Sequence, residues 1–273
     1  MLKDITLGQY YPTESAVHRA DPRVKLLLAT VYIVALFLIK NIWGFVFAAA
    51  ALLACIRLAR IPISTILRGL KAVLFILVFT AVINIFWTKG EHLLVSWKFI
   101  NIYLEGIYTA IFMALRIVLL IMGTGLFLTY TTTPIMLTNG LEYVLSPLKV
   151  FGVQVHEFAM MMSTALRFIP SLMEDTDRIM DAQKARGASF SSGGLIAKAK
   201  ALIPILIPLF VCAFKRADDL SVAMECRCYR GGKGRTKMTV MKFRTADWLW
   251  TVGAALFVAC ILLLNAVPSG FVL

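Results

Sequence analysis

Charged residues are scarce in this sequence. Only 16% of its 273 residues are Asp, Glu, Lys or Arg, whereas 60% are hydrophobic and the mean hydropathy is +0.82. Because soluble domains carry about 25% charged residues, this composition excludes an ordinary soluble fold and predicts a helical membrane protein. Acidic residues are the scarcer sign, at 15 against 28 Lys and Arg, for a net charge of +13. These cations lie beside apolar runs, so we attribute them to membrane topology and not to nucleic-acid binding.

The residue patterns of metal sites and disulfide frameworks are also missing. The cysteines are odd in number and form no Cys-x-x-Cys pair, and the three histidines are too scattered to be a ligand set. We therefore expect the chain itself to bind no metal and no cofactor. The first 25 residues contain no uninterrupted apolar core, so we expect no cleavable signal peptide. The residues concerned are Cys55, Cys212, Cys226, Cys228 and Cys260, and His18, His92 and His156.

Five apolar segments approach or exceed the length of about 20 helical residues that crosses a bilayer. They are residues 26–39, 42–56, 70–87, 102–130 and 248–267. Trp and Tyr cluster at their ends, as is typical of membrane interfaces. The sequence therefore predicts an all-α integral membrane protein with about five transmembrane helices.

Basic residues predict the orientation of these helices. Lys and Arg crowd the N-terminus and residues 131–244, whereas only Lys40, Lys89 and Lys98 fall on the other side. By the positive-inside rule, the N-terminus and the 131–244 region are cytoplasmic and the C-terminus is outside the cell membrane. We divide the chain into 1–130, with four spans, 131–244, and 245–273, with the last span. Arg116 lies inside an apolar run, and both helix packing and a functional buried contact remain open for it.

The 131–244 region is itself predicted to be helical. A short amphipathic helix over 134–150 precedes two long helices, near 155–186 and 195–229, and each long helix is apolar early and polar late. Each ends in an arginine between small residues. One basic residue in a last turn is explained by the helix dipole, but two such tips favour docking, because arginine forks onto carboxylates and carbonyls. The predicted docking residues are Ala185, Arg186, Gly187, Glu225, Cys226, Arg227 and Cys228.

The first long helix also carries a methionine-rich apolar face. Methionine side chains are flexible and suit adaptable binding surfaces, although plain helix packing is the alternative. The predicted contact residues are Phe158, Met161, Met162, Ala165, Ile169 and Leu172.

Acidic residues on both long helices suggest an enzyme as a second reading. Two acidic clusters in a multi-span protein are the pattern by which a membrane prenyltransferase holds magnesium and pyrophosphate. However, Asp175 and Asp177 lie about 200° apart around a helix, and the interleaved Arg178 and Lys184 would neutralise the site. A solvated helix face therefore explains the acids better, and a simple membrane anchor is a third reading. The clusters are Asp175, Asp177 and Asp181, and Asp218 and Asp219.

Two parts of the sequence resemble one known family. Gly8-Gln9-Tyr10 and the stretch from Ser15 to Lys25 look like the opening of the transmembrane T component of energy-coupling factor (ECF) transporters. The two arginine tips are similar to that family's two Ala-Arg-Gly motifs, and the likeness covers nearly the whole chain. One departure is that the second tip reads Cys226-Arg227-Cys228, which keeps the arginine and loses its Ala and Gly neighbours.

The resemblance implies a non-catalytic scaffold with two or three cytoplasmic coupling helices. In such a scaffold each arginine tip docks in a groove of one of two ABC ATPase subunits, which bind the ATP and Mg²⁺. The apolar faces of the coupling helices hold a separate S component, a membrane subunit that binds a vitamin or related micronutrient for uptake. The opening stretch looks most like the shared type, in which one scaffold serves several S components; a dedicated cobalt, nickel or biotin scaffold is the alternative.

Overall fold

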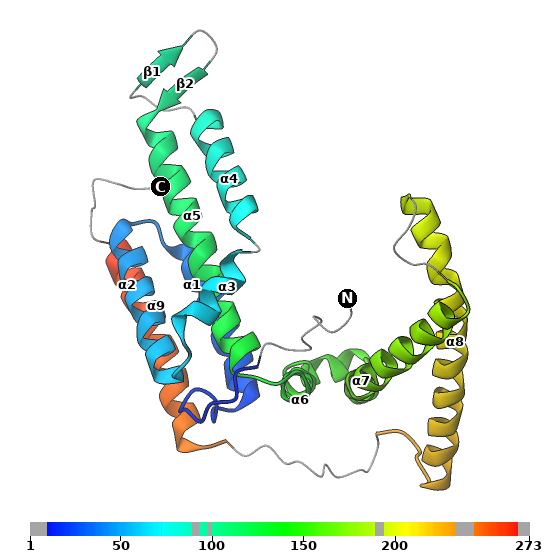
Figure 1. Cartoon of the computed structure of the whole chain (residues 1–273). Helices are drawn as coiled ribbons and strands as arrows, with labels where there is room; N and C mark the ends of the chain where they lie inside the picture. The colour runs from blue at the N-terminus through cyan, green and yellow to red at the C-terminus, as the bar shows by residue number, and fades with distance from the viewer. Residues whose placement is uncertain are drawn as a thin grey trace. The chain divides into compact units, whose positions relative to one another are not determined.

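The computed structural model describes residues 10–71, 73–88, 93–97, 100–188, 194–232 and 243–266, and it is almost entirely helical (Figure 1). The chain divides into two compact units. We call residues 8–143 and 240–273 the membrane unit, and residues 144–239 the α7–α8 unit.

The membrane unit contains the helices that correspond to the predicted spans. These are α1 (Pro22–Leu38), α2 (Ile42–Ala59), α3 (Ile63–Lys71), α4 (Leu74–Trp87), α5 (Leu104–Thr124), its π-helical continuation η2 (Gly125–Tyr130), and α9 (Thr245–Asn265). The short helix α6 (Pro134–Val144) follows η2. Within the described residues, three helices are long and apolar enough to cross a membrane, namely α2, α5 with η2, and α9. The α3–α4 pair, bent by 63°, would make a fourth.

The prediction of an all-α membrane protein is confirmed, while the count of five spans stays a prediction. Helix α1 has 17 residues, at the lower limit for a span. The third predicted span is shorter than expected, because the helix α4 begins only at Leu74. A small antiparallel hairpin, β1 (Leu93–Trp97) and β2 (Ile100–Tyr103), was not predicted, and it delays the start of α5 to Leu104. Lys89 and Lys98 lie outside the described residues.

Helices α1, α2, α5 and α9 share the core of the membrane unit. The Tyr32 hydroxyl of α1 donates to the Leu119 carbonyl oxygen of α5 at 2.9 Å, and its ring stacks on Phe257 of α9 with centroids 6.0 Å apart. Gly123 permits this approach, since a Cβ atom there would lie 2.1 Å from the Tyr32 ring. Burial of these side chains in one cluster therefore binds spans that are distant in sequence.

At one end of the bundle, polar side chains donate hydrogen bonds to the backbone carbonyl oxygens at the end of α1. Arg116 of α5 donates from Nη2 to the Ile39 carbonyl oxygen at 2.9 Å. Asn265 of α9 donates from Nδ2 to the Leu38 carbonyl oxygen at 2.7 Å. These carbonyls have no partner within α1 and form the negative end of its dipole. Of the two roles left open for Arg116, the contact seen is thus a structural one.

The opposite end holds a cluster of polar groups, which we call the polar junction: the half-buried His18 and the buried Asp21, Lys25, Thr131 and Asp247. Lys25 is 1% exposed and donates from Nζ to the carbonyl oxygens of Thr131 (2.8 Å) and His18 (3.1 Å). The Asp21 amide donates to Oδ1 of Asp247 at 2.9 Å. Burial, and then the nearby charge of Lys25, lower the pKa of His18, which favours the neutral form of its ring. The polar junction was not predicted from the sequence.

The polar junction fixes the directions of the helices. It joins the start of α1, the residue after η2 and the first turn of α9, whereas the ends of α1 and α9 meet at Asn265. Helices α1 and α9 therefore run in one direction, and α5 runs in the other. The first turn of α1 also contacts α6, since the Arg23 guanidinium carbon lies 3.6 Å from the centroid of the Tyr143 ring.

Candidate functional site: two arginine-tipped helices

The α7–α8 unit is built from two long helices, α7 (Val155–Ala185) and α8 (Leu195–Cys226), preceded by the 3-10 helix η3 (Ser146–Phe151). The two helices run antiparallel, because residues later in α7 contact residues earlier in α8. Three hydrogen-bonded pairs show this order: Gln183 with Pro204, Asp175 with Arg216, and Glu157 with Gly232 just beyond α8. The end of α7 therefore lies beside the first half of α8, and the end of α8 lies near the beginning of α7.

Arg216 is the central tie between the helices. Its Nη2 lies 2.6 Å from Oδ2 of Asp175, its Nη1 donates to the hydroxyl of Ser171, and its guanidinium carbon lies 5.7 Å from the Phe168 ring centroid. Both charges are partly buried, with side chains 29% and 22% exposed. Such a paired, half-desolvated contact is worth more than an exposed ion pair.

This contact also bears on the acidic clusters that suggested an enzyme. Asp175 is neutralised by Arg216, and Asp181 pairs with Lys184 at 3.0 Å. Among the residues that the structure describes, no three His, Cys, Asp or Glu side chains come together as a metal-binding set. Nothing in this arrangement supports the magnesium–pyrophosphate reading.

The first arginine tip is a tightly hydrogen-bonded helix end. Arg186 is the residue that caps α7, and Gly187 follows it with a positive φ of 88°. The Gly187 amide donates to the Lys184 carbonyl oxygen at 2.9 Å, and the Ala188 amide donates to the Gln183 carbonyl oxygen at 3.0 Å. This is the Schellman pattern, in which glycine is favoured because it alone adopts a positive φ at little cost.

The second tip repeats this pattern residue for residue. Arg227 caps α8, the Cys228 amide donates to the Glu225 carbonyl oxygen at 2.8 Å, and the Tyr229 amide donates to the Met224 carbonyl oxygen at 3.0 Å. Cys228 therefore occupies the place of Gly187 and has a φ of +55°. A non-glycine residue in this left-handed region costs about 1–2 kcal/mol. The Cys-Arg-Cys departure seen in the sequence thus falls at a strained backbone position.

Both arginine side chains are exposed and uncommitted. The last carbonyl groups of each helix are already taken by backbone amides, so neither guanidinium is needed to close its helix. Within the described part of the chain, neither side chain has a hydrogen-bond or ion-pair partner. All seven predicted docking residues, Ala185, Arg186, Gly187, Glu225, Cys226, Arg227 and Cys228, are exposed. A free guanidinium on a rigid helix end is suited to binding a partner.

The predicted apolar face of α7 is largely open. Phe158, Met161, Met162 and Ala165 are exposed, whereas Ile169 and Leu172 are half-buried. The structure adds a second apolar stripe that the sequence reasoning had assigned only to a region at or partly in the membrane. On α8, exposed side chains follow the helical spacing of four, three and four residues: Ile203, Ile207, Phe210 and Phe214. That spacing was readable in the sequence.

Comparisons with known proteins agree on one family. The CbiQ family, described as cobalt transport protein, matches residues 13–238. The energy-coupling factor transporter transmembrane protein EcfT of Clostridium kluyveri is 50% identical over 271 residues, covering 99% of this chain and 100% of that protein. The chain belongs to this family of ECF transporter transmembrane proteins. The resemblance inferred from its opening stretch and arginine tips is confirmed.

Other members of the ECF transmembrane family are nearly as similar. The EcfT protein of Ruminiclostridium cellulolyticum is 49% identical over 267 residues, which is 98% of this chain and 99% of that protein. The EcfT protein of Bacillus subtilis is 42% identical over 266 residues, which is 97% of this chain and 100% of that protein. This ECF family member is therefore a transmembrane component of a transporter and is located in a membrane.

Two residues of the candidate site were not found by sequence reasoning. Arg216 was read only as part of a charged half-helix, and Glu157, whose Oε1 accepts from the Gly232 amide at 3.2 Å, was not singled out. The sequence signal that could have found them is a charged residue beside an apolar helix face, because such a charge needs a partner. Sequence spacing does not show which residue of the other helix is that partner.

Proposed function

We propose that this chain is the coupling scaffold of an ECF transporter. Arg186 and Arg227 each dock on one of two ABC ATPase subunits, and the ATP and Mg²⁺ are bound by those subunits. The chain itself catalyses nothing and passes their movement to a vitamin-binding S component. The cargo is a vitamin or a related micronutrient, and the shared type of scaffold, which serves several S components, is favoured over a dedicated cobalt scaffold.

The single observation that carries this proposal is the equivalence of the two tips. Each presents one free, exposed guanidinium on a hydrogen-bonded helix end, and they lie at different ends of the α7–α8 pair. Because each helix is about 45 Å long, the two arginines are too far apart to share one groove. Two separate and similar partner sites fit this spacing, as a pair of homologous ATPases would supply.

The apolar surfaces support the second half of the proposal. The face of α7 at Phe158, Met161 and Met162 and the stripe of α8 at Phe210 and Phe214 are exposed without polar interruption. Exposed apolar side chains that are grouped on one helix face are typical of an interaction site. Flexible methionines let one surface repack against different partners, as interchangeable S components require.

The orientation is part of the proposal. We place the N-terminus and the α7–α8 unit in the cytoplasm and the C-terminus outside, because Arg23, Lys25, Arg57 and Arg244 border the spans at the end of the membrane unit that holds the polar junction. A thiol reagent that does not cross membranes should label a cysteine introduced near the C-terminus of a cysteine-free chain. It should not label a cysteine introduced at Ser192 until the membrane is opened. Labelling at position 192 in intact cells would contradict the proposed cytoplasmic location of this region.

The docking role is tested by co-purification from membranes. A tagged chain should bring down two ATPase subunits, and Arg186→Glu with Arg227→Glu should lose both while the chain still inserts. The matched control is Arg178→Glu with Lys215→Glu, which makes the same charge change at exposed positions of the same helices away from the tips. Loss of the ATPases in the control as well would show a general charge effect and overturn the assignment of the tips.

A further inference from the structure

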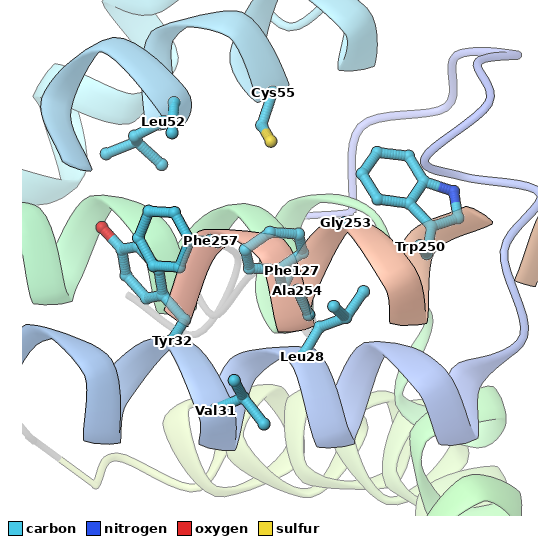
Figure 2. A pocket seen from close by; sticks show the side chains of 11 residues that line it. Leu28, Val31, Tyr32, Leu52, Cys55, Phe127, Trp250, Gly253, Ala254 and Phe257 are labelled. Carbon is cyan, nitrogen blue, oxygen red and sulfur yellow. The ribbon is translucent and has the colours of Figure 1, made fainter. Parts of the chain in front are cut away.

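A cavity of about 190 Å³ lies inside the membrane unit between α1, α2, η2 and α9 (Figure 2). Its walls are apolar and aromatic. Leu28 and Tyr32 come from α1, Cys55 from α2, Phe127 from η2, and Trp250 and Phe257 from α9. Figure 2 shows these side chains around one common space, with Trp250 at one end and Tyr32 with Phe257 toward the other.

The chemistry of the wall selects an apolar occupant. None of the described residues that line the cavity is charged, and the Tyr32 hydroxyl already donates to the Leu119 carbonyl oxygen at 2.9 Å. An apolar cavity of about 150 Å³ stays free of water and takes up hydrocarbon ligands. A cavity of this kind therefore binds hydrocarbon in preference to water or a polar solute.

The shape of the cavity runs along the spans. On α9 the lining residues are Trp250, Gly253, Ala254 and Phe257, which share one face over two helical turns. Those seven residues of rise correspond to about 10 Å along the helix axis. A lipid acyl chain in a bilayer lies in the same direction, whereas a whole helix, about 10 Å across, is too wide for this volume.

The depth of the cavity suits the upper part of an acyl chain. Leu28, Cys55 and Trp250 each lie between one and two turns from the end of their helix at the polar junction, and Phe127 lies within one turn of it. Tryptophan prefers the level of the lipid headgroups. The cavity thus begins just below the headgroups and continues into the hydrocarbon core.

We propose that this cavity is a binding site for one acyl chain of a bilayer lipid, held between α1, α2 and α9. The acyl chain fills space that the protein's own side chains leave open, and it completes the packing of spans that are distant in sequence. The proposal does not depend on ATPase docking, because all of its residues lie in the membrane unit.

Gly253 offers a way to block the site. It lines the cavity, and a Cβ atom added there would meet nothing within 4 Å. Gly253→Leu should therefore place apolar side-chain atoms in this space, starting from a Cβ atom that meets no neighbour. Gly253→Ala is the matched control, because it brings a similar gain in helix propensity and leaves most of the space open.

Quenching of tryptophan fluorescence by a phosphatidylcholine brominated at carbons 6 and 7 of one acyl chain tests the proposal. The full chain, with Trp250 as its only tryptophan, is placed in bilayer nanodiscs with and without the brominated lipid. A chain with only Trp248 is the reference, since that side chain is 67% exposed on the same turn of α9. Trp250 should be quenched at least as strongly as Trp248, and Gly253→Leu should reduce the quenching of Trp250 at least twofold without changing that of Trp248.

Two results would overturn the acyl-chain site. One is a Trp250 that the brominated lipid does not quench while Trp248 is quenched, a comparison that needs no change at Gly253. The other is equal quenching of Trp250 in Gly253→Leu and Gly253→Ala, which would mean that the lipid reaches Trp250 from outside the cavity.

Discussion

The two arginine tips share a backbone and differ in the residue that completes it. Both close with the same two hydrogen bonds and place an arginine at the cap, but the next residue is Gly187 in one and Cys228 in the other. They also differ in support, since Gly232 ties the segment after the second tip to Glu157 at the base of α7. An arginine therefore precedes both the unstrained glycine of the first tip and the strained cysteine of the second tip. Its presence at both tips favours a role for the arginine side chain itself.

The largest expected effect comes from reversing one arginine at a time. Arg186→Glu and Arg227→Glu should each weaken ATPase binding by about 2–5 kcal/mol, the usual cost of breaking a buried charged contact. A helix-dipole role would cost only about 0.3–1 kcal/mol. Titration of each purified ATPase subunit onto each variant measures the difference. If the tips serve different subunits, the two variants should lose different ones; loss of the same subunit from both would contradict the two-site proposal.

Replacing arginine by lysine should have a smaller effect at both tips. Lysine keeps the charge and loses the planar fork, so Arg186→Lys or Arg227→Lys should cost about 1.5 kcal/mol of ATPase binding, the value of one hydrogen bond to a charged group. The same titration measures it, with uptake of a labelled vitamin in cells as the second readout. Binding equal to that of the unmodified chain would mean that charge alone is recognised.

Exchanging the residues after the arginines should change stability in opposite directions. Gly187→Cys places a side chain at a φ of +88° and should destabilise the first tip by about 1–2 kcal/mol. Cys228→Gly relieves the same strain at the second tip and should stabilise it by about 1 kcal/mol or less, because glycine also gains freedom in the unfolded chain. Hydrogen exchange of the tip amides reports both changes.

Cys228→Ala is the control for that exchange. It removes the thiol and keeps the strained conformation, so tip stability and vitamin uptake should stay near those of the unmodified chain. Loss of uptake in Cys228→Ala would assign the thiol a role of its own. A loss of tip stability in Cys228→Gly would contradict the strain argument.

The smallest expected effect comes from weakening the Glu157 contact, which supports the segment after the second tip and has no counterpart at the first tip within the described residues. Glu157→Gln keeps an acceptor for the Gly232 amide and removes its charge, so the contact should weaken by less than about 1 kcal/mol. Faster hydrogen exchange is expected at residues 229–232 and not at residues 186–188. Equal change at both tips would show that Glu157 acts on the whole α7–α8 unit.

Much of this architecture was predictable because its causes are local. Long apolar runs become helices such as α2 and α9, and the Arg-Gly pair at 186–187 ends α7 where it was expected to end. The arginine tips were found in the same way, because helix periodicity and glycine act within a few residues. The hairpin before α5 was missed because residues 93–101 were left as a connection between two predicted spans and residues 102–103 were counted in the second span, although the segment is rich in β-branched and aromatic types.

Contacts between distant residues were decided only by the tertiary structure. Lys25 meets Thr131 across 106 positions and Asp21 meets Asp247 across 226, and no spacing rule relates them. The ion pair between Asp175 and Arg216 also joins residues that are distant in sequence. It shows that Asp175, which the sequence placed in an acidic cluster, takes part in a helix–helix contact. By itself the sequence determined which segments form long apolar helices and where the arginines stand, because hydropathy and helix ends depend on residues that are close in the chain. The partners of the buried charges were decided only by tertiary packing. Burying a charge costs free energy, and that cost is offset by a polar group that lies next to the charge only in the folded chain.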